Sequence, residues 1–347
     1  MTIEWLAGNR LRGTTAEKPV GSLASPSVGG WVEVGRTTLG SANADILVSS
    51  LPDKRYYMIL YADKGQASNG ADVNIRLNGD TGSNYAYRRC GNGGNDATDV
   101  STSTSYGIWA GSAVQTPIFG VFYLANKSDK EKLWQGHAVT QHTAGAGNDP
   151  ERSELVTKWA NTSSVVSSIT AHGTSNLASG SEVVVLGWDP ADTHTTNFWE
   201  ELASVELGAE ADELSSGTIA AKKYLWVQAY VKKTGTANTR WRFNNDTGSN
   251  YALRQSGNGL TDTTPSSQTS IFTHANTSDN ALVNMFIINN SANEKLLIAH
   301  ETARGSDRRE VVAKWSNTSS QITEIDLVQL DSGGFSAGTL MKVWGSD

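Results

Sequence analysis

Cysteine is nearly absent from this chain, since Cys90 is the only one among 347 residues. A single thiol excludes a disulfide scaffold and a cysteine metal cluster. Apolar runs are short as well: none reaches the length of a membrane-spanning helix, and the first ten residues lack the apolar core of a secretory signal. We therefore expect a protein with no membrane partner that is made and matured in a cytoplasm.

Basic residues are too few for a protein that coats nucleic acid. Asp and Glu number 35 against 28 Lys and Arg, a net charge of −7, whereas nucleic-acid-binding surfaces are basic. The sequence also has no Gly-x-Ser-x-Gly elbow, phosphate-binding loop or dinucleotide fingerprint. His137 and His300 occupy matching places in the two copies, and the other four histidines have no partner at a metal-ligand spacing, so no zinc site is expected. We expect no nucleic acid partner, no metal, no cofactor and no enzymatic activity.

What the chain does contain is an internal repeat. The heptapeptide Asp-Thr-Gly-Ser-Asn-Tyr-Ala occurs at 80–86 and again at 246–252. Other segments recur in the same order, among them Glu-Lys-Leu at 131–133 and 294–296, and Lys-Trp-x-Asn-Thr-Ser-Ser at 158–164 and 314–320. A period this long indicates that a whole domain was duplicated, because solenoid units are much shorter. Cys90 is matched by Ser256, so the fold does not depend on the thiol.

Both copies carry the pattern of short β-strands. Residues 73–77 alternate between apolar and polar, and the matching residues 239–243 do the same. The segment 200–213 has the composition of a helix, but it aligns with 32–45, whose Val, Thr and Gly residues do not support one. The sequence predicts an all-β protein with two tandem antiparallel β-sandwiches of jelly-roll type. The expected parts are an extended N-terminal arm at 1–30, the first sandwich at 31–189, a linker at 190–198 and the second sandwich at 199–347.

The repeated loops at 80–85 and 246–251 are the candidate ligand or contact sites. The side chains expected to reach a ligand or a neighbour are Asp80, Asn84, Tyr85, Asp246, Asn250 and Tyr251. Their oxygen-rich spacing is like that of a calcium loop, but the later bidentate carboxylate is missing. The alternative is an Asx-type turn with Gly82 or Gly248 at a positive φ, and we favour the turn.

Two other repeated features have both a functional and a structural interpretation. Trp159 and Trp315 could stack on a sugar ring, but tryptophans buried in a sandwich core are commoner. Glu154 and Glu310 recur beside arginines, and paired carboxylates can hydrolyse a glycosidic bond. A solvated, ion-paired sheet edge is the commoner arrangement, and we favour it.

Residues 1–30 belong to neither copy. They contain many Gly and Pro residues and few apolar ones, so alone they cannot bury enough surface to offset the entropy of the chain. Arg10, Arg12 and Lys18 make this segment basic. It is either a solvated leader or an arm that docks on a neighbouring subunit, and these three residues are then the candidate assembly contacts.

Several of these segments together resemble a known group of proteins. The leader at 8–19, the two pairs of repeated turns and the ending Gly-Ser-Glu-Val-Val-Val-Leu-Gly at 180–187 are similar to uncharacterised virion structural proteins of tailed phages and marine viruses. The resemblance covers nearly the whole chain. It implies a setting, a virus particle assembled in a host cytoplasm, and no known chemistry. A likeness to double-jelly-roll capsid proteins is one of fold alone.

The sequence therefore favours a non-enzymatic virion structural protein: a capsid, head decoration, fibre or tail component. We expect it to assemble through its sandwiches and its arm, with other virion subunits as partners, as a homo-oligomer. The alternative is a tandem carbohydrate-binding module whose two repeated loops read a host surface glycan and gain from avidity.

Overall fold

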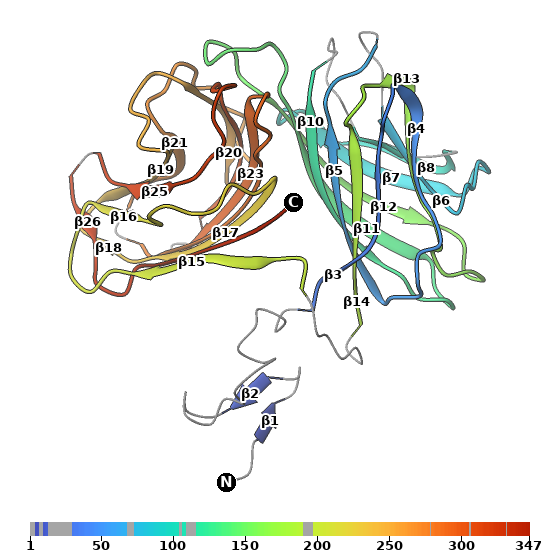
Figure 1. The fold of residues 1–347 in the computed structure, drawn as a ribbon, viewed down its shortest axis with the longest axis horizontal. Helices are drawn as coiled ribbons and strands as arrows, with labels where there is room; N and C mark the ends of the chain where they lie inside the picture. Colours follow the sequence, from blue (N-terminus) through green and yellow to red (C-terminus); the bar gives the residue numbers. More distant parts are fainter. Residues whose placement is uncertain are drawn as a thin grey trace.

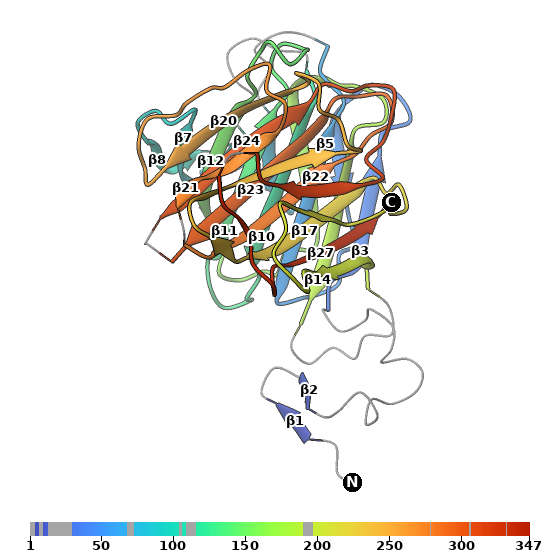
Figure 2. The same ribbon diagram turned by 90° about the vertical axis from the view of Figure 1, so that its left-hand side faces the viewer.

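The computed structural model describes residues 4–6, 10–12, 30–67, 73–103, 106–108, 116–189, 197–277, 279–304, 307–330 and 332–347. Within these residues the protein consists of β-strands and turns, without an α-helix. No helix in this part of the chain is long and apolar enough to cross a membrane. Two β-sandwiches, one from each copy, lie beside each other (Figure 1 and Figure 2). The prediction of an all-β tandem-sandwich fold is confirmed.

The first copy has jelly-roll topology. Its strands are β3 (Val32–Thr38), β4 (Asn43–Val48), β5 (Tyr56–Asp63), β6 (Val73–Leu77), β7 (Tyr85–Gly91), β8 (Ala97–Ser103), β9 (Tyr106–Ile108), β10 (Ile118–Ala125), β11 (Lys132–Thr140), β12 (Glu151–Trp159), β13 (Ile169–Leu177) and β14 (Glu182–Trp188). The large sheet has the order β3-β14-β5-β10-β11-β12-β7-β8, and the small sheet the order β4-β13-β6-β9. Without β7, β8, β11 and β12, the strands counted in chain order read 1-8-3-6 and 2-7-4-5, the order of a jelly roll. The four extra strands widen the large sheet.

The second copy repeats this arrangement. Its strands are β15 (Glu200–Glu206), β16 (Glu213–Ser215), β17 (Tyr224–Val231), β18 (Lys233–Thr234), β19 (Ala237–Phe243), β20 (Tyr251–Gly257), β21 (Ile271–Thr277), β22 (Ala281–Ile288), β23 (Lys295–Ala303), β24 (Arg308–Trp315), β25 (Ile325–Val328), β26 (Gly334–Phe335) and β27 (Leu340–Ser346). The large sheet is β15-β27-β17-β22-β23-β24-β20 and the small sheet β16-β25-β19-β21, with β18 and β26 as a separate pair. Residues 200–213, which have the composition of a helix, begin with strand β15, so the prediction from the repeat that this segment is not helical is confirmed.

The two-residue alternation of the strands builds one core in each sandwich. In β6, Val73, Ile75 and Leu77 are buried, and the matching side chains of β19 are buried as well. The apolar side chains of both sheets meet inside each copy as a separate cluster. The period-two pattern is thus confirmed, and alternate residues of each large sheet are left to face outward.

The outer faces of the two large sheets pack against each other. Their contact is a third apolar cluster that contains Met58, Leu60, Ala62, Phe119, Val121, Val139, Val184 and Leu186 from the first copy, Phe198 from the end of the expected linker, and Trp199, Tyr224, Phe286, Ile288, Leu296, Ile298 and Val312 from the second copy. The rings of Phe119 and Tyr224 are 6.4 Å apart across it. An apolar interface of this kind holds two domains in a fixed orientation.

The N-terminal arm contains one described feature, a short antiparallel pair of strands. Strand β1 (Glu4–Leu6) pairs with β2 (Arg10–Arg12). Arg10 and Arg12 therefore sit at the two ends of β2, while Lys18 lies outside the described residues, as do residues 190–196 of the expected linker. The candidate assembly contacts of the arm stay a prediction.

Candidate binding groove

The repeated loops are closed by their own hydrogen bonds. The carboxylate of Asp80 accepts the backbone N–H of Gly82 and the side-chain amide of Asn84, both at 2.8 Å. It also accepts the indole N–H of Trp159 at 2.7 Å. Asp246 holds the second loop in the same way. This is the Asx-type turn that the sequence favoured.

Two expectations about these loops are wrong. Tyr85 and Tyr251 are fully buried, so neither can contact a ligand or a neighbouring subunit; each begins a strand and faces the core. The positive φ belongs to Asn78 and Gly79 rather than to Gly82. Gly82 is needed for a different reason, because a Cβ there would lie 2.8 Å from the amide nitrogen that closes the loop. The polar side chains of the loops, Asp80, Asn84, Asp246 and Asn250, stay at the surface as candidate contacts.

A buried lysine lies beside each repeated tryptophan. The ammonium groups of Lys132 and Lys295 are 5.8 and 5.7 Å from the ring centroids of Trp159 and Trp315. Each lysine donates to two backbone carbonyls, and burial lowers the pKa of Lys295 to about 8. Both tryptophans are at least 98 % buried. Their interpretation as core residues rather than sugar platforms is confirmed.

The two repeated glutamates meet at the interface between the copies. Arg152, only 5 % exposed, binds Glu154 of its own strand and Glu310 of the second copy, the latter at 2.7 Å. It also binds Asp262 at 2.8 Å. The expectation of a solvated charged edge is therefore wrong, because the second sandwich covers these charges. Because both glutamates bind the same guanidinium, they are not arranged as an acid and a base on opposite sides of a substrate. Among the described residues, no group of three His, Cys, Asp or Glu side chains is placed to hold a metal ion.

Two matching histidines face each other across the same interface. The ring centroids of His137 and His300 are 4.3 Å apart. Burial, aided by His300 and Arg152, lowers the pKa of His137 to about 3. The two rings border a cavity of about 140 Å³, which is also lined by the matching residues Tyr123 and Phe286. Equivalent positions meet at this one point, but the apolar contact beside it is not symmetric, because Phe119 packs on Tyr224 whereas the matching residues Leu282 and Tyr56 are exposed.

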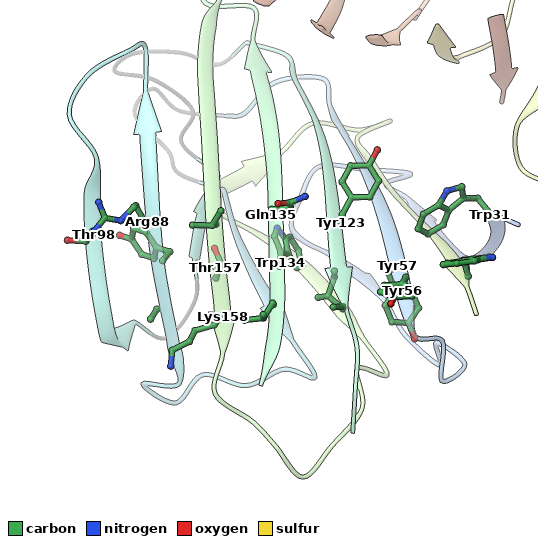
Figure 3. A pocket seen from close by; sticks show the side chains of 17 residues that line it. Trp31, Tyr56, Tyr57, Arg88, Thr98, Tyr123, Trp134, Gln135, Thr157 and Lys158 are labelled. Atoms are coloured by element: carbon green, nitrogen blue, oxygen red, sulfur yellow. The ribbon is translucent and has the colours of Figure 1, made fainter. Parts of the chain in front are cut away.

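An open groove of about 780 Å³ lies on the outer face of the first copy's large sheet (Figure 3). Its outward-facing lining comprises the aromatic residues Trp31, Tyr56, Tyr123 and Trp188, the aliphatic residues Leu133 and Val156, and the polar residues Arg88, Gln135 and Lys158. Tyr56 stacks on Trp188 with centroids 5.3 Å apart, and Trp31 lies 6.4 Å from Tyr123 and from Trp188. An exposed apolar surface of this extent marks a binding site.

The positions that match the groove in the second copy are buried. The exposed fractions are 57 % for Leu133 against 0 % for Leu296, 52 % for Val156 against 1 % for Val312, and 37 % for Tyr56 against 0 % for Tyr224. In the second copy this surface packs against the first copy, whereas in the first copy the same surface is open to solvent. Lys158 and Lys314 show the same contrast, with side chains 40 % and 0 % exposed.

Sequence reasoning missed the groove because it concentrated on identical loops. The available signal was apolar residues at outward-facing strand positions. Leu133 and Val156 flank the core residues Trp134 and Leu155 in strands β11 and β12, where an alternating strand normally carries polar side chains.

Comparisons with known proteins leave the family open. No family model matches the chain, and no curated protein matches it. Among solved structures, the chain is similar to domains LG4-5 of the mouse laminin alpha1 chain, with 10 % identity over 90 % of this chain and 89 % of that one, at a TM-score of 0.20. So low a TM-score supports no inference about function.

Proposed function

We propose that the protein is a non-enzymatic structural subunit of a virus particle, and that it works by assembly. The observation that carries this proposal is the groove, an apolar surface that is open in the first copy, while the matching surface of the second copy is buried against the first copy. Exposed Leu and Val side chains lower solubility when nothing covers them, so their presence favours a surface that is covered in the working state. The resemblance of the sequence to virion proteins supplies the setting.

The proposal is tested by the mass of the protein in solution. Light scattering over a range of concentrations is expected to show species larger than one chain. The variant Leu133→Glu places a charge at the centre of the groove and is expected to abolish them. Leu47→Glu is the matched control, because Leu47 is 50 % exposed on β4 of the opposite sheet and should not matter. A chain that stays monomeric and binds no virion component would contradict the proposal.

A second candidate function is glycan binding, and it is favoured by the composition of the same groove. Four aromatic rings lie at one side of the groove next to Gln135, and Lys158 and Arg88 lie further across the same sheet. This combination of apolar platforms and polar groups suits a sugar chain. A glycan array tests it, with Tyr56→Ala expected to lose any signal. This candidate moves the predicted glycan site from the repeated loops to the sheet face.

A further inference from the structure

The contact between the two copies uses a different part of each large sheet. The first copy contributes the Phe119 patch, defined as Leu60, Ala62, Phe119, Val121 and Val184. The second copy contributes the positions that match the groove, including Tyr224, whose ring meets Phe119. Two surfaces therefore have no binding partner within the chain. One is the groove of the first copy, and the other is the surface of the second copy at the positions that match the Phe119 patch.

The second copy has its own version of the Phe119 patch, and it is exposed. Phe119 lies opposite Ala62 in the β10–β5 pair, and in the equivalent β22–β17 pair Leu282 lies opposite Tyr230. Phe119 and Ala62 are 1 % and 3 % exposed, whereas Leu282 and Tyr230 are 53 % and 44 % exposed. Leu282, Tyr230 and the neighbouring Gln228 are here called the Tyr230 patch.

We propose that the groove of one chain binds the Tyr230 patch of a second copy, so that chains associate through the contact that already joins the two copies within a chain. Leu282 of one chain then meets Tyr56 of the next, as Phe119 meets Tyr224 inside each chain. The inference rests on the proposed function, assembly through the groove. Because the two surfaces differ, every bound chain still offers one of them, and association continues into a ring or a filament.

The composition of the two surfaces suits a reversible contact. In the Tyr230 patch, Gln228 replaces Leu60, and the neighbouring Asn284 replaces Val121, so this surface is more polar than the Phe119 patch. Interfaces between separately folded chains are about as apolar as the rest of a protein surface, with aromatic side chains enriched at their centre. We therefore expect association that depends on concentration and is weaker than the contact within the chain.

The experiment uses two single variants of the full-length chain and their mixture. Leu133→Glu disables the groove, and Leu282→Glu disables the Tyr230 patch. Each is expected to weaken self-association at least about tenfold in sedimentation velocity, as loss of a central contact does. Mixed in equal amounts, they still share one intact groove and one intact patch, so the mixture is expected to form a dimer of two chains and nothing larger. Both side chains are more than half exposed, so both variants should fold, which circular dichroism checks.

The possible outcomes separate this inference from the proposed function. If Leu133→Glu abolishes association while Leu282→Glu leaves it unchanged, the groove binds another surface, such as a second groove or the arm. The partner proposed here is then wrong and the assembly function stands. If the wild-type chain never self-associates but binds another virion component through the groove, the inference again falls alone. If it binds neither, both fall.

A cross-linking experiment tests the geometry directly. In a Cys90→Ser background, which uses the serine found at the matching position of the second copy, one chain carries Tyr56→Cys and another carries Leu282→Cys. Oxidation of the mixture is expected to join the two chains by a disulfide, and neither variant alone should form such a dimer to the same extent. Equal cross-linking in each variant alone would overturn the head-to-tail arrangement.

Discussion

Trp159 donates its indole N–H to Asp80 at 2.7 Å, and this bond joins the two most strongly repeated segments of the first copy. Trp315 and Asp246 make the same bond at 2.6 Å in the second. These two segments therefore recur in both copies because the aspartate of one fixes a surface turn to the buried tryptophan of the other. Their repetition records a shared fold.

The Trp159–Asp80 bond leads to a prediction about acid stability. Partial desolvation tends to raise the pKa of Asp80, but hydrogen bonds from Trp159, Asn84 and Gly82 outweigh it and hold the pKa below its usual value. The folded state therefore binds fewer protons, and the stabilisation is lost as the pH falls through the folded pKa. Asp80→Ala leaves the buried indole without its acceptor and is expected to lower the free energy of unfolding by about 1–3 kcal/mol at pH 7, and by less at pH 3. Urea denaturation at both pH values checks this, and an equal loss at both would contradict it.

Lys295 gives a prediction at alkaline pH. Burial lowers its pKa to about 8, from the usual value of 10.5. Between these values the unfolded chain binds more protons than the folded one, so the contribution of Lys295 to stability rises with pH across this window. Lys295→Met removes this dependence, although it leaves two backbone carbonyls without a donor. The difference in unfolding free energy between wild type and variant, measured from pH 7.5 to 10, should shift in favour of the wild type. A difference that is flat over this range would show that the ammonium is not perturbed by burial.

The fold was predictable from the sequence because the repeat shows the same pattern of strands and turns twice. The alternation in β6 and β19 and the strand at β15 follow from residues that both copies share. The apolar outward-facing positions are visible in the sequence, but which copy leaves them open is not, and the physical reason is visible in Leu133 and Leu296. They are the same residue at the same position of two equivalent strands, β11 and β23, yet one is 57 % exposed and the other fully buried. The difference arises from the packing of one sandwich on the other, which strand periodicity does not encode.

The histidine pair predicts that the interface between the copies weakens in acid. The folded pKa of His137 is about 3, because burial and the neighbouring His300 and Arg152 oppose its protonation. As the pH falls from 6.5 towards 3, the unfolded chain takes up a proton that the folded chain refuses, so stability falls by up to about 1.4 kcal/mol per pH unit. His137→Gln should flatten this dependence. Urea denaturation of the wild type and the variant at several pH values compares the two slopes, and equal slopes would contradict the prediction.

The hydrogen bond between Tyr224 and Glu182 leads to a prediction about the stability of the interface between the two sandwiches. The hydroxyl of Tyr224, in the second copy, donates to the buried carboxylate of Glu182, in the first, at 2.7 Å. Lys223 donates to the same carboxylate at 2.9 Å. Desolvation tends to raise the pKa of Glu182, but hydrogen bonds from Thr38, Lys223 and Tyr224 outweigh it and hold the pKa below its usual value. The carboxylate is therefore charged at neutral pH and needs these donors.

Tyr224→Phe removes one donor from this buried charge and is expected to cost about 1–3 kcal/mol. Because the lost bond joins the copies, the thermal transition of the variant should separate into two steps, one for each sandwich, whereas the wild type should unfold in one. Differential scanning calorimetry checks this. Tyr56→Phe, at the matching but exposed position in the groove, is the control and should change the stability by less than about 0.5 kcal/mol. Equal effects of the two substitutions would show that Glu182 does not couple the sandwiches.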